Sequence, residues 1–213
     1  MIAEPPSLHV HRGDLPPDVN FGSCVAIDTE TLGLRLRRDK LCVVQLSAGD
    51  GSCHLVHFPP QMRASGAYDA PRLRALLGDP AITKLFHFGR FDIAMLHLHL
   101  GVLARPVFCT KIAAKLVRTY TDRQGLKELC RELLGIELSK EQQSSDWGAE
   151  ELTPEQIRYA ANDVLFLHRL RERLQEMLVR EGRLDLAEAC FQFLPERALL
   201  DLAGWPEEDI FAH

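Results

Sequence analysis

The order of its apolar segments constrains the fold of this chain more than any other feature of the sequence. Apolar runs of strand length recur five times, at residues 23–29, 41–47, 53–58, 82–87 and 106–108. The second and third runs are separated by Gly49-Asp50-Gly51, a typical hairpin turn, whereas the later runs alternate with segments of helical periodicity. Hairpin-linked strands followed by strands that alternate with helices predict an α/β fold, in which helices cover a mixed β-sheet.

Helical periodicity and helix-terminal residues predict helices at residues 71–77, 91–100, 110–117, 126–134, 154 to about 180, and about 184–194. The helix at 154 has the clearest start, because Thr153 can cap it, Pro154 suits its first position and Gln156 completes a capping box. Residues 1–20 are rich in proline and are expected to be irregular, as is the tail after the last helix.

The chain has 213 residues, of which 46% are apolar, and this is enough for one core of ordinary size. We therefore expect one domain over residues 1–213, with its core at about 20–180. The segment 181–213 is rich in apolar side chains, so it is expected to pack on the domain or to form oligomer contacts. The formal net charge of −5 argues against tight, non-specific binding to long nucleic acid, which favours a basic surface.

Three features indicate a cytoplasmic protein. No stretch approaches the eighteen or so consecutive apolar residues of a transmembrane helix. The first residues also lack the apolar core of a signal peptide. None of the six cysteines belongs to a C-x-x-C pair, and most lie in apolar runs. Such cysteines are typical of reduced, buried thiols, and they do not form the pattern of a zinc site.

Two carboxylates follow the first apolar run at an interval of two residues. Asp28 and Glu30 lie at the carboxyl end of the predicted strand, where side chains at i and i+2 share one face. Two unit charges about 4 Å apart repel by roughly 4 kcal/mol at an effective dielectric constant near 20. A divalent cation removes this repulsion, and oxygen ligands suit Mg²⁺ or Mn²⁺. The alternative is a solvated turn, since D-x-E is a common sequence.

Three further polar residues have both a functional and a structural interpretation. Asp92 falls in the first turn of the helix after strand 82–87, where a carboxylate binds a ligand or complements the helix dipole, worth roughly 0.3–1 kcal/mol. Tyr159 and Asp163 are i and i+4 on one face of the helix that starts at 154, within an otherwise apolar stripe. Polar groups in such a stripe need partners, either at a shared site or in a neighbouring loop.

Taken together, DTE, an Asp behind a strand, and Y-x-x-x-D in a late helix resemble the DEDD exonucleases, in the branch that carries tyrosine. LCVVQLS, GLKELCRELLGIELSK and SSDW resemble the ribonuclease D family, so that the resemblance covers about residues 20–180. It implies a ribonuclease-H-like fold of the DnaQ exonuclease type. It also implies a 3′→5′ exoribonuclease that uses two divalent metal ions, Mg²⁺ or Mn²⁺.

The resemblance also implies roles for individual residues. By their places in the motifs, Asp28, Glu30, Asp92 and Asp163 are the expected metal ligands and catalytic carboxylates. Tyr159 is the expected catalytic residue that positions the attacking water. With a reference pKa near 10, a tyrosine is a poor base in bulk water. We therefore expect Tyr159 to orient the nucleophile and to share its proton.

Within this family, the chain most resembles the compact nanoRNases. RGDLP, FHFGRFD, RTYTDRQGLKE and GWPEEDIFAH carry this closer resemblance almost from end to end. Only about thirty residues follow the long helix, too few for the extra helical domains of ribonuclease D. The resemblance implies a preference for very short RNA, especially 5′-phosphorylated dinucleotides, including linear products of cyclic-dinucleotide breakdown. It also implies a homo-oligomer, a ring-shaped octamer.

Five residues are the candidates for substrate binding: Thr31, Leu34, His87, Phe88 and Arg90. Related short-RNA exonucleases place a leucine at the position of Leu34, between two bases. Leu34 is therefore the expected wedge, and its alternative is a packed loop residue. Phe88 can stack on a base, a contact worth roughly 1–3 kcal/mol, or it can be a core residue of the strand.

Three other functions fit parts of the pattern. The first is ribonuclease D-like 3′ trimming of longer or structured RNA, which activity on long substrates would indicate. The second is a non-catalytic nucleic-acid-binding module, whose sign would be a lost metal carboxylate, and none is lost here. The third is a proofreading DNA exonuclease, because the contacts to the 2′-OH that distinguish RNA from DNA do not show in a sequence.

Overall fold

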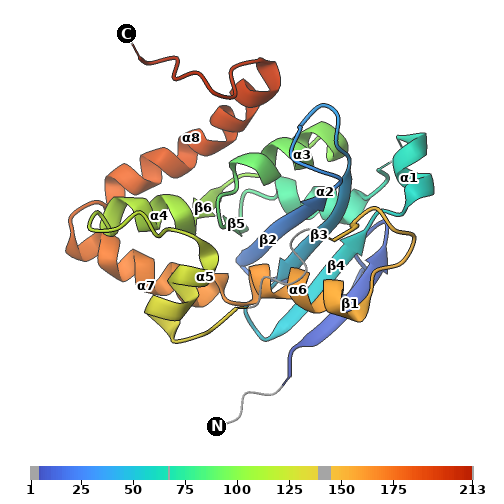
Figure 1. Cartoon of the computed structure of the whole chain (residues 1–213), viewed down its shortest axis with the longest axis horizontal. Helices are drawn as coiled ribbons and strands as arrows, with labels where there is room; N and C mark the ends of the chain where they lie inside the picture. Colours follow the sequence, from blue (N-terminus) through green and yellow to red (C-terminus); the bar gives the residue numbers. More distant parts are fainter. Residues whose placement is uncertain (1–4, 67, 139–144, 213) are drawn as a thin grey trace.

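Six strands form one mixed sheet in the computed structural model, which describes residues 5–66, 68–138 and 145–212 (Figure 1). The strands are β1 (Ser7–Arg12), β2 (Cys24–Thr31), β3 (Leu41–Ser47), β4 (Ser52–His57), β5 (Thr83–Phe86) and β6 (Val107–Cys109). Their order in the sheet is β1-β4-β3-β2-β5-β6. Strand β3 is antiparallel to both of its neighbours, and the other pairs are parallel. The predicted mixed sheet and its hairpin are therefore confirmed.

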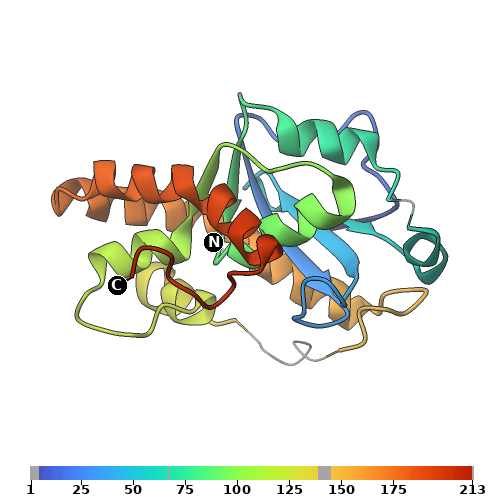
Figure 2. The ribbon, with the colours of Figure 1, turned by 90° about the horizontal axis from the view of Figure 1, so that it is seen from above.

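Helices cover this sheet on both faces, since every residue of β3 is buried. They are α1 (Pro60–Ser65), α2 (Pro71–Gly78), α3 (Arg90–Leu100), α4 (Thr110–Val117), α5 (Leu126–Leu129), the π-helix η1 (Cys130–Leu134), α6 (Pro154–Leu165), α7 (Leu167–Arg180) and α8 (Leu184–Ala203). Helix α6 packs along β2, β3 and β4, whereas α8 packs on α3, α4 and β6 (Figure 2). Within the described residues, no helix is long and apolar enough to cross a bilayer.

The prediction that residues 1–20 are irregular is wrong for β1. This strand pairs in parallel with β4 at the edge of the sheet, and most of its residues are exposed. An edge strand with one neighbour needs few apolar side chains, and here imidazoles occupy alternate positions, so the sequence lacks the usual strand pattern.

The prediction of one helix from 154 to about 180 is also wrong. The chain breaks at Phe166, whose φ of −105° and ψ of −3° separate α6 from α7. The break allows α6 to follow the sheet while α7 packs on α4. The last helix, by contrast, continues beyond residue 194 and through Pro195, because Leu194 and Ala198 extend its buried face.

Candidate active site

Strand β2 delivers two carboxylates to the site. Asp28 stands opposite Gln45 of β3, whose side-chain amide Nε2 lies 3.4 Å from Asp28 Oδ2. The register between the two strands then shifts between Glu30 and Thr31. Such an irregularity bends a strand and redirects its side chains. Both carboxylates face the same cavity, as expected from their i and i+2 spacing.

Helix α6 brings the third carboxylate to the same point. Its start is fixed by the predicted capping box: Gln156 N donates to the Thr153 hydroxyl, and Thr153 N donates to Gln156 Oε1. With the start fixed, the helical period directs Asp163 toward β2. Asp28, Glu30 and Asp163 each offer an oxygen, and the three oxygens lie within 4.8 Å of one another.

Asp92 completes the set from the first turn of α3. It is buried, and its Oδ1 accepts a hydrogen bond of 2.6 Å from the Thr29 hydroxyl. A side chain on Gly89 would meet Phe86 at 2.5 Å, so glycine is required for α3 to begin this close to the end of β5. Asp92 lies outside the 4.8 Å group, yet its charge raises the pKa of both Asp28 and Asp163.

The four carboxyl groups hold protons far more tightly than exposed ones. Burial is the main cause for each, and the charges of the neighbouring carboxylates raise the pKa of Asp28, Glu30 and Asp163 further. The pKa of Asp28 lies well above its usual value, and the others reach about 9 for Glu30, about 7 for Asp163 and about 6 for Asp92. A buried, all-oxygen cluster of like charges fits hard divalent cations such as Mg²⁺ and Mn²⁺.

Tyr159 lies one helical turn before Asp163 and lines the same cavity. Its ring packs near Trp147, with 6.1 Å between the ring centroids. Burial, and then the charge of Asp163, raises the pKa of the Tyr159 hydroxyl. The phenol therefore remains protonated at neutral pH and can donate a hydrogen bond at the site.

The cavity between these groups has a volume of about 590 Å³. Of the candidate substrate-binding residues, Thr31, Leu34 and His87 line it. Sequence reasoning did not identify its other walls, which include Leu32, Leu126, Ser145 and Trp147. In the sequence, only its position in the segment SSDW, which resembles the ribonuclease D family, indicates that Trp147 lies near the site.

Leu34 sits in a loop that the protein holds in shape. The Thr31 hydroxyl donates to Gly33 O at 2.6 Å, and Arg35 N donates to Asp39 Oδ2 at 2.9 Å. Leu34 itself is 84% exposed. It is therefore available to a ligand, and the alternative of a packed loop leucine does not describe it.

Phe88 and Arg90 are absent from the cavity walls. Phe88 is half exposed rather than in the core, and its backbone has a positive φ of 68°. Its ring makes a cation–π contact with Lys111, whose Nζ lies 3.8 Å from the ring centroid. Arg90 forms a two-point ion pair of 2.5 and 2.6 Å with Asp201 of α8. This pair ties α8 to the start of α3, so the geometry gives Arg90 a structural contact.

His87 is neutral and fixed. Burial lowers the pKa of its imidazole to about 3, with a smaller effect from the nearby Lys111 charge. Its Nδ1 lies 2.9 Å from the Thr110 hydroxyl, which in turn donates to Phe86 O. His87 therefore presents an uncharged ring to the cavity.

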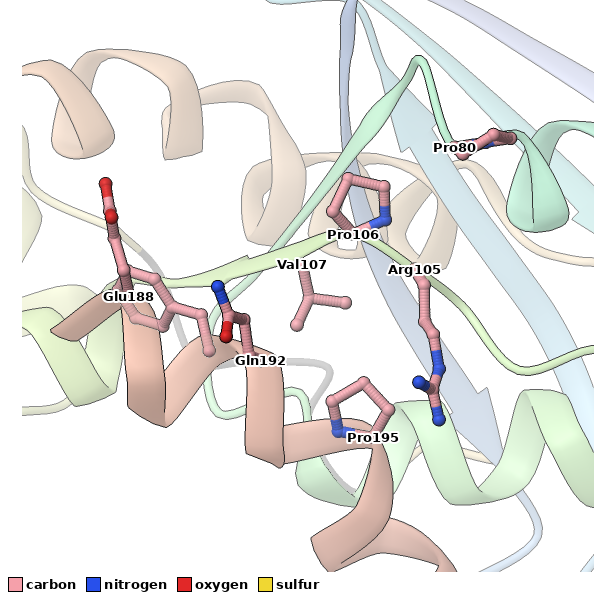
Figure 3. A pocket seen from close by; sticks show the side chains of 8 residues that line it. Pro80, Arg105, Pro106, Val107, Glu188, Gln192 and Pro195 are labelled. Carbon is pink, nitrogen blue, oxygen red and sulfur yellow. The ribbon is translucent and has the colours of Figure 1, made fainter. Parts of the chain in front are cut away.

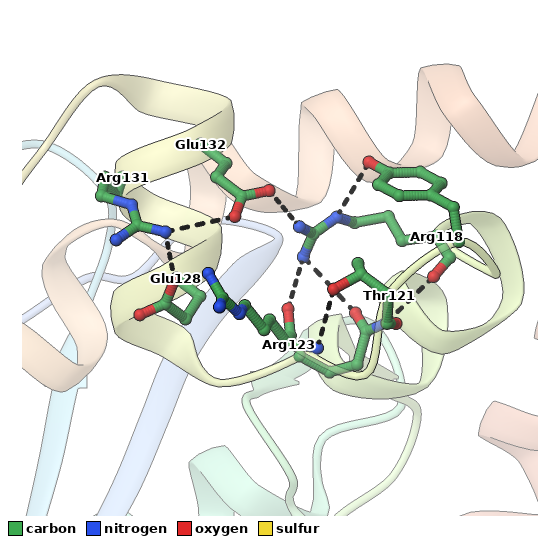
Figure 4. Close-up of polar contacts among 8 residues, drawn as sticks. Arg118, Thr121, Arg123, Glu128, Arg131 and Glu132 are labelled. Atoms are coloured by element: carbon green, nitrogen blue, oxygen red, sulfur yellow. Dashed lines mark hydrogen bonds and ion pairs between the residues drawn. The ribbon is translucent and has the colours of Figure 1, made fainter.

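A buried arginine orders the segment that leads into the cavity wall. Arg118 is fully buried, donates to Arg123 O at 2.8 Å and pairs with Glu132 of η1 (Figure 4). Gln124 closes the same turn through the carbonyl oxygens of Arg118 and Thr121. These contacts fix the loop of residues 118–125, immediately before Leu126 of the cavity.

The fold and the four carboxylates define a 3′–5′ exonuclease of the ribonuclease-H-like, DnaQ type. The family model described as 3′-5′ exonuclease matches residues 17–179, and the chain belongs to this family. Ribonuclease D of Acidiphilium cryptum is 38% identical over 161 residues, which are 76% of this chain and 39% of that protein. The chain thus spans about two fifths of the length of the curated ribonuclease D sequence that it matches.

Among solved structures, the chain is similar over nearly its whole length to NrnC (nanoRNase C) of Brucella melitensis. The complex of that protein with pGG has a TM-score of 0.92 and 56% identity, covering 98% of this chain and 99% of that one. Its structure with bound Mg²⁺ has a TM-score of 0.91 and 55% identity. Ribonuclease D of Escherichia coli has a TM-score of 0.71 and 27% identity, over 83% of this chain and 45% of that one.

These similarities confirm the predicted fold, the exonuclease class and the resemblance to a compact relative of ribonuclease D. The carboxylate cluster fits the divalent metals that exonucleases of this family use.

Proposed function

We propose that the chain is a 3′→5′ exoribonuclease that hydrolyses very short RNA to mononucleotides. Its main substrates are 5′-phosphorylated dinucleotides, including the linear products of cyclic-dinucleotide breakdown. The observation that carries this proposal is the end-to-end similarity to a nanoRNase C whose structure contains pGG. The cavity supports it, because 590 Å³ suits one small ligand and lies well within the usual range of small-molecule sites, roughly 300–1,000 Å³.

In this proposal, each residue of the site has a defined role in metal binding or catalysis. Asp28, Glu30, Asp92 and Asp163 would hold two divalent ions, Mg²⁺ or Mn²⁺. Such ions, when bound, lower the pKa of a bound water and neutralise charge on a reacting phosphate. Thr29 fixes Asp92 through its hydrogen bond.

Tyr159 supplies a protonated hydroxyl beside the carboxylates and orients the attacking water. Leu34 projects from its fixed loop and separates the two bases of a dinucleotide. His87 offers an uncharged ring that admits a phosphodiester without adding a fixed charge. A longer chain would have to pass the Leu34 loop, which is why we infer selectivity for the shortest substrates.

The test is a time course of the purified protein with Mg²⁺ or Mn²⁺ on 5′-phosphorylated RNAs of two, five and twenty nucleotides. We expect the initial rate of hydrolysis of the two-mer to exceed the rates for the five-mer and the twenty-mer by a large factor. Parallel reactions with EDTA, and with the DNA two-mer, separate metal dependence and recognition of the 2′-OH from length selection. Progressive shortening of the twenty-mer while the two-mer persists would contradict the proposal and favour ribonuclease D-like trimming.

The alternatives give different outcomes in the same reactions. Equal rates on DNA and RNA two-mers would indicate a DNA exonuclease. Binding without hydrolysis would indicate a non-catalytic module. The four carboxylates in place argue against that module.

We also propose that the protein acts in the cytoplasm as a homo-oligomer, an octamer. Trp205, Ile210 and Phe211 of the tail are exposed, and apolar side chains of this size favour burial against another subunit. All six cysteines are free thiols, as a reducing compartment requires. Light scattering should give eight times the 24.0 kDa mass of one chain. A monomeric mass would contradict the oligomer without affecting the proposed reaction.

A further inference from the structure

A second group of ligand-bearing side chains lies at the β1–β4 edge, away from the carboxylates. His9 and His11 are i and i+2 on β1, so their side chains share one face of the sheet. His54 of β4 stands in register with His9, and paired residues of neighbouring strands point to the same face. Two strands therefore bring three imidazoles together, and β3 separates them from β2.

The three imidazoles are in direct contact. The ring centroids are 4.8 Å apart for His9 and His54, 5.2 Å for His11 and His54, and 6.4 Å for His9 and His11. His11 Nε2 and His54 Nδ1 lie 2.9 Å apart, so one ring donates a hydrogen bond to the other. The Phe21 ring packs against His54 at an interplanar angle of 79°, with 5.6 Å between the ring centroids.

Their surroundings favour neutral rings beside a negative charge. Burial, and then the neighbouring imidazoles, lowers the pKa of His11 and of His54. Asp18 acts in the opposite direction on both, which places a carboxylate near the pair. A metal ion of the zinc or nickel type binds the unprotonated nitrogen of an imidazole, and a nearby carboxylate balances part of its charge.

We propose that His9, His11 and His54 form a binding site for a transition-metal ion of the Zn²⁺ or Ni²⁺ class. Imidazole nitrogens suit these ions, whereas the all-oxygen site at β2 suits Mg²⁺ or Mn²⁺. Zinc–nitrogen bonds of about 2.0–2.1 Å place two ligating nitrogens about 3.3 Å apart in a tetrahedron. His11 Nε2 and His54 Nδ1 are 2.9 Å apart, which is a hydrogen-bond distance, so these two rings must separate and tilt slightly to reach this geometry.

Among the described residues, only Asp28, Glu30 and Asp163 already hold three ligand atoms within 4.8 Å of one another, so the histidine site requires the rings to turn and one proton to move. The rings are stacked within 19° of parallel, so His9, which is exposed, must turn its ring toward the other two. The proton shared by His11 and His54 moves to the outer nitrogen of the donor ring, so both rings stay neutral and no proton is lost. Ser7 Oγ, 2.8 Å from His9 Nε2, accepts from that nitrogen while Nδ1 faces the ion.

Calorimetric titration of the full chain with ZnCl₂ or NiCl₂ tests this proposal. Excess Mg²⁺ is present throughout, so that the carboxylates are already occupied. We expect one site per chain, and His54→Ala and His9→Gln should each weaken binding at least about tenfold, the lower bound for loss of a metal-supporting group. The control is Arg12→Gln, the next residue on β1, whose side chain points to the other face and is exposed.

Thermal denaturation provides the second measurement. Zn²⁺ should raise the midpoint for the wild type and for Arg12→Gln, because binding to the folded state stabilises it, and not for either histidine variant. His9 is exposed, so His9→Gln keeps the test valid if His54→Ala fails to fold. Unchanged affinity in both histidine variants, or no binding by the wild type, overturns the site. Hydrolysis with Mg²⁺ alone should be the same in all four proteins.

Discussion

Two cavities of similar volume differ in the charges that they contain. The cavity at the end of β2 measures about 590 Å³ and encloses three carboxylates with raised pKa values. The cavity between β6 and α8 measures about 620 Å³, and its walls include Pro106, Val107 and Pro195 (Figure 3). Volume therefore does not distinguish an active site in this molecule. Buried like charges do, because such an arrangement is unfavourable unless a ligand compensates it.

The two cavities also differ in how far their charges are compensated. Around the β6–α8 cavity, Arg105 is paired with Glu196 at 2.6 Å, so its charge is already compensated. At the β2 cavity, burial and mutual repulsion oppose ionisation, and the folded protein retains protons there. Under the proposed function, metal ions replace these protons in the β2 cavity, and no such exchange is expected in the β6–α8 cavity.

Asp28→Asn should produce the largest effect on this contrast. It removes one ligand, and the loss of several kcal/mol of metal-dependent stabilisation corresponds to a decrease in kcat of about a thousandfold or more. The metal-free variant should also unfold at a higher temperature than the wild type, since a buried neutral amide avoids the cost of protonating or desolvating the Asp28 carboxylate. Initial rates on the RNA two-mer and thermal denaturation in EDTA measure the two effects.

The control for this variant is Asp185→Asn, which removes an exposed carboxylate at the start of α8. Its rate and stability should match those of the wild type. A rate for Asp28→Asn within tenfold of the wild type would mean that the carboxylates are not the metal site.

Tyr159→Phe should have the second largest effect. The change keeps the ring against Trp147 but removes the hydroxyl, so kcat should fall by about a hundredfold or more, as for other residues that assist proton transfer, whereas KM should change little. The matched control is Tyr68→Phe, whose hydroxyl donates to Leu41 O away from the cavity. That control should lose about 1 kcal/mol of stability and no activity. Equal activity in both variants would limit Tyr159 to packing.

Much of the carboxylate site could be predicted from the sequence, because local rules place it. The alternation of β2 gives Asp28 and Glu30 one face, and the capping box at Thr153 fixes the phase that directs Asp163. Tertiary contacts are different. Arg90 pairs with Asp201, which lies 111 residues later, and no local pattern selects that partner. The same limit applies to Trp147 and to the break at Phe166, which depend on which surface each segment packs against.

The pH dependence of stability should distinguish the metal-free from the metal-bound protein. The folded state raises the pKa of Glu30 to about 9 and of Asp163 to about 7, whereas in the unfolded chain both ionise near pH 4. Between pH 6.5 and 8 the folded state therefore binds more protons, and stability in EDTA should fall as pH rises. The expected slope is about 1.4 kcal/mol per pH unit for each proton of difference.

The measurement is the free energy of unfolding at pH 6.5 and at pH 8, in EDTA and in Mg²⁺. Mg²⁺ replaces the protons, so it should flatten the slope. Burial lowers the pKa of Lys84 to about 8 and of His87 to about 3, which gives opposite contributions near the upper and the lower limit, respectively. Asp28→Asn contains the same lysine and histidine, so the difference between the two proteins isolates the carboxylate cluster. A flat profile for the wild type in EDTA would show that these groups are not desolvated together.

Leu34→Ala should change selectivity more than rate. The residue is 84% exposed, so truncation of its side chain removes little packing and stability should be unaffected. Loss of a contact between bases, worth roughly 1–3 kcal/mol, should reduce the preference for the two-mer over the five-mer by about tenfold. Leu186→Ala on α8, also exposed, is the matched control. The same length preference in both variants would remove the wedge role and leave the carboxylate site intact.

Gln192→Ala should have the smallest effect, and it tests the other half of the comparison. Gln192 lines the β6–α8 cavity, where no carboxylate cluster is present among the described residues (Figure 3). We expect kcat/KM on the two-mer to stay within about twofold of the wild type, as for surface changes that move stability by about 0.5 kcal/mol or less. A tenfold loss would mean that this cavity is coupled to the chemistry, through α8 and its Arg90–Asp201 contact with the start of α3. In that case, charge density alone would no longer separate the active cavity from the inactive one.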